Sequence, residues 1–223
     1  MIDYKIIATG SQGNSVVIGN EVMVDVGVPY KAIVPYMGAL RLVLLTHEHS
    51  DHFKPSTVKR MAFERPLLRF GCGDFMVKHL IDAGVPKSRI DVLNENMLYT
   101  YKPLCQVIPV GMVHDVPNFG YKIFFDKGKV FYATDTGSLS GVQARNYDLY
   151  LVEANYIDDE LKARMDAKIE AGEYAYERRV IGTHLSKKQA DDWIYRNMGQ
   201  NSEYVYLHCH REREDNESTN FGV

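Results

Sequence analysis

The stretch Thr46-His47-Glu48-His49-Ser50-Asp51-His52 places three of the chain's eight histidines and an aspartate within six residues. It follows the apolar run 42–45, which has the length and composition of a buried strand. Pro55 suits the first position of a helix, so we expect a helix to begin just after the cluster. The cluster therefore lies between a strand and a helix, a usual place for functional residues in α/β folds.

The spacing of these side chains is typical of a metal site. In extended backbone, side chains two residues apart point to the same side, so His47 and His49 can converge on one cation. Asp51 and His52 lie beyond the bend and can reach a second cation beside the first. Imidazole and carboxylate groups are suitable ligands for zinc, manganese or iron.

The motif His47-x-His49-x-Asp51-His52 resembles the signature of the metallo-β-lactamase superfamily. Two weaker marks of that family are the turn at 10–15, which leads to Val24-Asp25-Val26-Gly27, and the stretch 133–137. The resemblance runs from about Ile6 to His208 and points to the small phosphodiesterase- and nuclease-like members of bacteria and their phages. It implies an α/β fold, an αβ/βα sandwich of two stacked mixed sheets with helices outside.

The resemblance also implies ligands beyond the motif. His114 follows a predicted strand and precedes a predicted hairpin over 121–133, as a ligand of the family does. Asp135, after the second hairpin strand, is expected to bridge the two cations. The zinc β-lactamases usually carry cysteine there, so the aspartate argues against that activity.

The last ligand is expected after the strand predicted at 203–207. His208 fits the family position, and His210 remains the alternative. The implied first metal site consists of His47, His49, His114 and Asp135, and the second of Asp51, His52, Asp135 and His208.

His184 resembles the histidine of a Gly-His-Ser-type loop that lies near the phosphate or leaving group in phosphodiesterase relatives. Ser186 and Gln189 form an S-x-x-Q pattern, which predicts a capping box at the start of a helix. Glu153, after the strand predicted at 148–152, is expected either to orient a histidine or to be a structural carboxylate. The polar segments 158–171 and 173–180 are predicted to be helical. Substrate-specific features are expected in this region before any other, although most of it is expected to be a solvated charged face.

Length, composition and charge further limit the class of protein and its partners. With 223 residues, 45% hydrophobic and 25% charged, the chain is typical of a soluble globular protein. We expect a single domain over 1–210 and a flexible polar tail at 211–223. The net charge of −3 gives no global attraction to nucleic acid, so such binding requires a local basic patch.

The chain shows no disulfide, secretion or membrane signal. Its three cysteines are odd in number and widely spaced, which does not indicate a disulfide framework. No signal peptide is recognisable, and no apolar run approaches the roughly 20 residues of a membrane span. We therefore expect a cytoplasmic protein of a bacterial or phage-infected cell.

The resemblance implies a dinuclear metal-dependent hydrolase. The favoured hypothesis is a phosphodiesterase or nuclease that uses a metal-bridging hydroxide. The expected cofactors are two divalent ions, Zn²⁺ or Mn²⁺, with iron also compatible. Asp51 is expected to accept a proton, and His184 to stabilise or protonate the leaving oxygen. The expected substrate is a phosphodiester, either nucleic acid or nucleotide, and a homodimer is left open.

Three alternatives stay open at this point. A thioester or lactone hydrolase would share the ligands but leave the His184 loop without a clear role. A metal-stabilised binding protein would hold the metals without turnover. An iron-based redox role is compatible with the ligand types.

Overall fold

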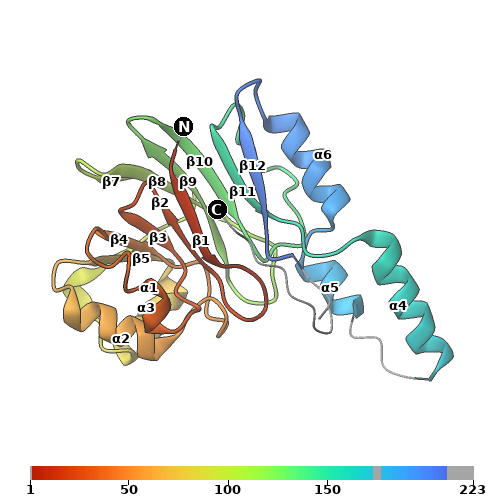
Figure 1. Ribbon diagram of the computed structural model, residues 1–223, viewed down its shortest axis with the longest axis horizontal. Helices are drawn as coiled ribbons and strands as arrows, with labels where there is room; N and C mark the ends of the chain where they lie inside the picture. Colours follow the sequence, from red (N-terminus) through yellow and green to blue (C-terminus); the bar gives the residue numbers. More distant parts are fainter. Residues whose placement is uncertain (1, 173–176, 210–223) are drawn as a thin grey trace.

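Two six-stranded sheets, each formed by a continuous half of the chain, stack on one another in the computed structural model (Figure 1). The structure describes residues 2–172 and 177–209. The first sheet contains, in spatial order, β1 (Tyr4–Ala8), β2 (Ser15–Ile18), β3 (Val22–Val24), β4 (Leu42–Leu44), β5 (Arg69–Cys72) and β6 (Ile90–Val92). The second contains β12 (Glu203–Leu207), β11 (Leu149–Glu153), β10 (Gly128–Ala133), β9 (Phe119–Phe125), β8 (Cys105–Gly111) and β7 (Tyr99–Tyr101).

Both sheets are mixed and follow the same plan. Strands β1 to β3 pair antiparallel and β3 to β6 pair parallel. In the second sheet, β7 to β10 pair antiparallel and β10 to β12 parallel. Parallel neighbours bring their carboxyl ends to the same edge of a sheet, where ligand-binding loops gather.

The helices lie outside the stacked sheets. Helices α1 (Tyr30–Ile33), α2 (Pro55–Glu64) and α3 (Asp74–Asp82) accompany the first sheet, and a 3₁₀ turn, η1, spans Lys87–Arg89. Helix α6 (Lys187–Asn197) packs on the second sheet, whereas α4 (Asp158–Glu170) and α5 (Glu177–Thr183) extend beyond it (Figure 1).

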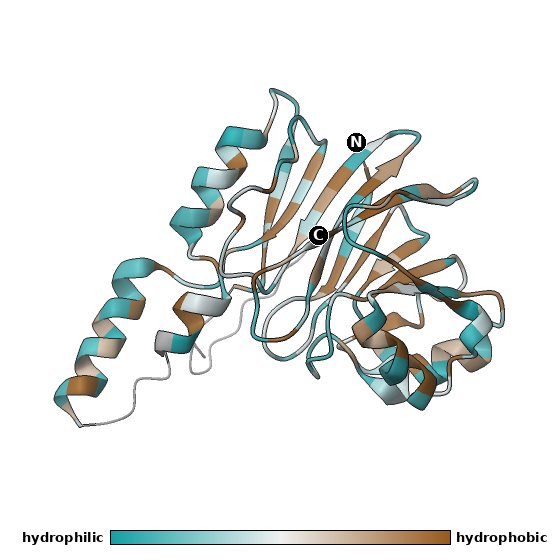
Figure 2. Cartoon of the chain, turned by 180° about the vertical axis from the view of Figure 1, so that it is seen from behind, coloured by the Kyte–Doolittle hydropathy of each residue, from teal (hydrophilic) through white to brown (hydrophobic). Residues whose placement is uncertain are grey.

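Three apolar layers hold these elements together. The middle layer lies between the sheets and includes Val22, Leu44, Tyr121 and Leu151. The outer two layers lie between each sheet and its helices. Apolar residues accordingly concentrate on the strands, while α4 is largely hydrophilic (Figure 2) and buries Leu161 alone among its residues. The predicted αβ/βα sandwich is confirmed.

Most predicted elements are present with small shifts. The helix expected just after the motif begins at Pro55, and the Ser186–Gln189 capping box forms with both hydrogen bonds. Strands β5 and β6 were not predicted, because β5 contains a glycine and β6 has only three residues.

Some sequence-based expectations concern undescribed parts of the chain. The tail at 211–223, the alternative ligand His210 and residues 173–176 of a predicted helix lie outside the described residues. The single domain over 1–210 stays a prediction. Each helix in the described ranges falls short of the length and hydrophobicity that crossing a membrane requires.

Candidate metal centre

The seven predicted ligands lie together in two adjoining groups. Within each group, one nitrogen or oxygen atom of every residue lies within 4.8 Å of the others. The loop after β4 supplies four of the residues, and the second sheet supplies the rest from the ends of β8, β10 and β12. The first group contains His47, His49, His114 and Asp135, and the second contains Asp51, His52, Asp135 and His208.

The spacing in the first group fits a tetrahedral cation. His49 Nδ1 lies 3.1 Å from His47 Nε2 and 3.3 Å from His114 Nε2. Asp135 Oδ2 lies 3.7 Å from His47 Nε2 and 3.8 Å from His114 Nε2. Ligands bound to zinc at about 2.0–2.1 Å are separated by about 3.4 Å along each tetrahedral edge. These four residues therefore fit one metal ion.

The second group presents its donors in the same way. His52 Nε2 lies 3.3 Å from Asp135 Oδ1 and 3.5 Å from Asp51 Oδ2. His208 Nε2 lies 3.5 Å from Asp51 Oδ2 and is a buried nitrogen without a hydrogen-bond partner in the described chain. Asp135 thus directs Oδ1 to this group and Oδ2 to the first, the arrangement of a carboxylate that bridges two cations.

Other residues hold the imidazole rings so that a nitrogen faces the centre. Asp25 Oδ2 lies 2.7 Å from His52 Nδ1, and the carbonyl of Thr183 lies 3.1 Å from His114 Nδ1. A partner of this kind fixes the tautomer and leaves Nε2 as the metal-binding nitrogen.

The two groups differ in their electrostatics: burial favours neutral imidazole in the first group, whereas neighbouring carboxylates raise the pKa of His52 and of His208 in the second. Burial lowers the pKa of His47 to about 2, so this side chain is a neutral ligand. Burial opposes ionisation of Asp135, but attraction to His52, His208 and His47 outweighs it and holds the carboxyl pKa well below its usual range. A divalent cation requires deprotonated donors, so His47 and Asp135 are ready to bind one, whereas binding in the second group would displace protons from His52 and His208.

The backbone is strained where the centre is built. Asp25, Asp135 and His208 have φ angles of 61°, 53° and 48°, in the left-handed region that non-glycine residues rarely occupy. Each such residue costs about 1–3 kcal/mol and persists where surrounding contacts hold it. Gly27 is also required here, because a Cβ at this position would lie 1.7 Å from the carbonyl oxygen of Asp51.

The turn at 10–15 borders the centre, as the resemblance implied. Asn14 is buried, and its Nδ2 donates to Asp51 Oδ2 at 3.2 Å. Asp25 was given no role in the sequence-based prediction, although it is fully buried and orients His52. The sequence feature that could have indicated this role is the position of Asp25, an acidic residue directly after the buried strand β3.

We expect Asp25→Asn to weaken metal binding about 10- to 100-fold, because the amide no longer accepts a charge-assisted hydrogen bond from His52. Competition with a chromophoric chelator measures this affinity. The matched control is Asp126→Asn, an exposed aspartate in the turn between β9 and β10. Equal metal affinities for the two variants would refute the role of Asp25.

His184 lies at the border of the second group. Its Nδ1 is 3.0 Å from Glu153 Oε2, and its ring stacks on that of His208 with centroids 5.1 Å apart. Glu153 is fully buried and also accepts a hydrogen bond from the backbone N–H of Leu185 at 3.2 Å. Asp135, Glu153, His184 and His208 form a third close group of possible ligands. Glu153 therefore orients a histidine, one of its two expected roles.

A cavity of about 350 Å³ opens over the centre. Side chains of both metal groups line it together with His184 and Arg179 of α5. Arg179 pairs with Asp115, whose Oδ1 lies 3.1 Å from His114 Nε2. A substrate in this cavity would meet both groups and His184 at once.

The fold and the paired His/Asp groups define a protein class. The sequence model of the family described as the beta-lactamase superfamily domain matches residues 27–185, and the chain belongs to this family.

Two curated relatives carry the name exodeoxyribonuclease. The chain is 27% identical to exodeoxyribonuclease WalJ of Streptococcus pneumoniae over 96% of its own length and 82% of that protein. It is 27% identical to exodeoxyribonuclease YycJ of Bacillus anthracis over 62% of its length and 56% of the relative.

Solved structures share the fold at lower identity. The metallo-beta-lactamase fold protein YhfI from Bacillus subtilis has a TM-score of 0.71 and 16% identity, covering 93% of this chain and 86% of its own. The short form of human tRNase Z has a TM-score of 0.67 and 17% identity, covering 94% of this chain and 92% of its own.

Proposed function

We propose that this chain is a metal-dependent exodeoxyribonuclease that hydrolyses phosphodiester bonds. The observation that carries the proposal is the pair of His/Asp groups that share Asp135 at the floor of one cavity. The exodeoxyribonuclease relatives, aligned over 96% of the chain in the longest case, support DNA as the substrate.

We propose two divalent cations, Zn²⁺ or Mn²⁺ with iron also compatible, held by the two groups described above. Divalent cations in such a pair stabilise charge on phosphoryl oxygens and make water acidic enough to ionise near neutral pH. His47, His52 and Asp135 are almost fully buried, so the ligands are rigidly placed before substrate arrives.

Two side chains are proposed to move protons. Asp51 is partly exposed to the cavity and is suited to accept a proton from the attacking water. His184 is suited to donate a proton to the leaving sugar oxygen, because Glu153 occupies its Nδ1 and leaves Nε2 for the substrate.

Thioester or lactone hydrolysis remains the second candidate activity. It would use the same centre, but it gives the Glu153–His184 pair no evident task. Cytoplasmic location and a homodimer stay predictions.

We expect metal-loaded protein to shorten linear end-labelled DNA and to leave covalently closed circular DNA intact. An exonuclease starts at a strand end, which the circle lacks. Gel electrophoresis with Mn²⁺ or Zn²⁺ measures this, and excess chelator is expected to stop the reaction because it removes the cations. Nicking of the circular DNA would refute the exonuclease assignment. If the protein left DNA intact but hydrolysed a thioester, the second candidate activity would be favoured.

A further inference from the structure

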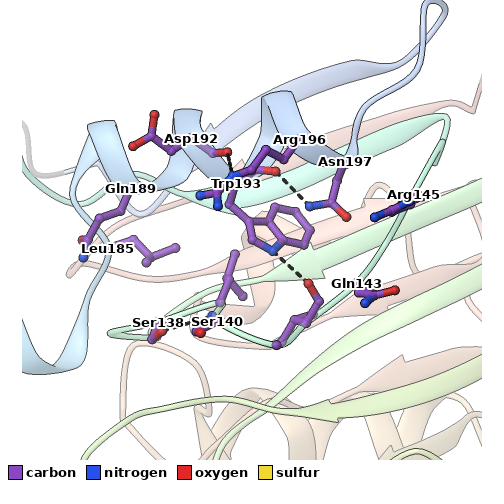
Figure 3. Close-up of a pocket in the computed structure, with 13 residues that line it drawn as sticks. Ser138, Ser140, Gln143, Arg145, Leu185, Gln189, Asp192, Trp193, Arg196 and Asn197 are labelled. Carbon is purple, nitrogen blue, oxygen red and sulfur yellow. Dashed lines mark hydrogen bonds between the residues drawn. The ribbon is translucent and has the colours of Figure 1, made fainter.

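A second pocket, of about 420 Å³, lies between helix α6 and the segment 138–145 (Figure 3). Trp193 lies at its centre, Ser138, Ser140 and Leu185 lie toward one end, and Gln143 and Arg145 toward the other (Figure 3). Arg196 and Gln189 of α6 complete the polar lining. The pocket thus combines an apolar floor with hydroxyl, amide and guanidinium groups.

The charge available in this pocket is positive. Asp192 is its one acidic lining residue, and its carboxylate already accepts a hydrogen bond from Lys188 at 2.7 Å. Arg145 and Arg196 are exposed, and neither forms an ion pair with another described residue. Arg196 Nε donates to the backbone carbonyl of Asp192 at 2.6 Å, so its other guanidinium nitrogens and the guanidinium of Arg145 are available to bind an anion.

The pocket is held in shape without a ligand. Trp193 Nε1 donates to the carbonyl of Val142 at 3.0 Å. The backbone N–H of Ala144 donates to Asn197 Oδ1 at 3.0 Å. These bonds fix the segment 138–145 to helix α6, so binding there requires little ordering of the chain.

The pocket adjoins the metal centre along the chain at two places. Leu185 lines the pocket and His184 lines the cavity over the centre. Ser138 follows the bridging Asp135 by three residues. Since consecutive Cα atoms lie about 3.8 Å apart, a polymer bound in the cavity needs to extend by only a few such steps to reach the end of the pocket at Ser138 and Leu185, and must continue along the pocket to reach Arg145 at the other end.

A larger pocket also contains basic residues but is less suited to DNA. Arg41, Arg65, Arg69 and Lys102 line it, together with Glu21 and Asp91. Arg69 binds Asp91 through two nitrogens, and Arg41 lies 3.5 Å from Glu21. It borders the first residues of β4 and β5, whereas the metal centre follows the other end of β4. Two of its three arginines, Arg41 and Arg69, are thus paired with carboxylates, and the pocket is distant from the metal centre.

We propose that the pocket beneath α6 binds the DNA strand beyond the scissile phosphate, with Arg145 and Arg196 on backbone phosphates. This inference rests on the proposed function and adds the path of the substrate. Phosphate contacts neutralise charge without reading bases, so the contribution is independent of sequence. The path also supplies the local basic patch that a chain of net charge −3 needs for nucleic acid.

The test compares the double variant Arg145→Ala/Arg196→Ala with the control pair Arg41→Ala/Lys102→Ala, which removes the same charge from the other basic pocket. Fluorescence anisotropy measures binding of a phosphorothioate-linked single strand, which resists cleavage, to each metal-loaded protein. We expect the first pair to weaken binding at least about 10-fold and to lower the slope of log affinity against log salt by about 1.4, or about 0.7 per lost contact.

Hydrolysis of bis(p-nitrophenyl) phosphate by the same proteins separates this inference from the proposed activity. This small diester has no strand to extend into the pocket, so its turnover is expected to be equal in the double variant and the wild type. Equal DNA binding by the two variant pairs would overturn the inference even if the wild type cuts DNA. A wild-type protein that hydrolyses neither substrate would instead refute the proposed function.

Discussion

Asp135→Ala is expected to reduce hydrolysis of both DNA and bis(p-nitrophenyl) phosphate by at least about 10³-fold, because it removes one proposed ligand from each of two cations. Asp135 directs its two oxygens to different groups, and its side chain is only 3% exposed. Water can enter such a buried position only in part, so the lost ligand is poorly replaced.

Metal analysis of the purified variant provides a second measurement. We expect Asp135→Ala to retain clearly less metal per chain than the wild type after dialysis. The exposed Asp126→Ala serves as the control for loss of a carboxylate and is expected to retain both metal and activity. Full metal content together with full turnover in Asp135→Ala would exclude the bridging role.

His184→Ala is expected to slow DNA cleavage by about 10²- to 10⁴-fold while leaving hydrolysis of bis(p-nitrophenyl) phosphate nearly unchanged. A sugar hydroxyl is a poor leaving group and gains from a proton donor, whereas nitrophenolate leaves without protonation. The position of His184, oriented by Glu153 and lining the cavity, fits a donor to the leaving oxygen.

Two controls distinguish this role from metal binding. His184 belongs to neither of the two proposed metal groups, although it lies close to Asp135 and His208 in a third group. The metal content of His184→Ala is therefore expected to match that of the wild type. His79→Ala, a half-exposed histidine paired with Glu48, is the matched substitution outside the cavity. Equal losses on both substrates, with loss of metal, would show that His184 acts as a ligand.

The fold and the ligand cluster were predictable because the short motif at residues 47–52 indicated both. His47, His49, Asp51 and His52 are neighbours in the chain, so their spacing alone indicated a metal site. The remaining ligands were predicted from a family resemblance, and the structure brings His114, Asp135 and His208 to the same place. The family and the fold are both confirmed by the comparisons.

Features made by distant residues were not predictable in this way. Asp25 orients His52 across 27 positions, and Trp193 binds Val142 across 51. Neither pair forms a local pattern, because its members meet only after the sheets and helix α6 have assembled. Arg145 and Arg196 likewise read as ordinary surface charges until the fold brings them to one pocket.

The division of the ligands between the two sheets affects when the protein becomes active during its synthesis. Residues 4–92 build the first sheet and hold four ligands, while the second sheet, which ends at Leu207, holds the others. Chains emerge from the ribosome with the amino-terminal half first. A nascent chain therefore has no complete centre until β12 and His208 are in place. If the proposed function holds, two fragments separated within the exposed segment 94–98 are expected to be inactive alone and active when combined.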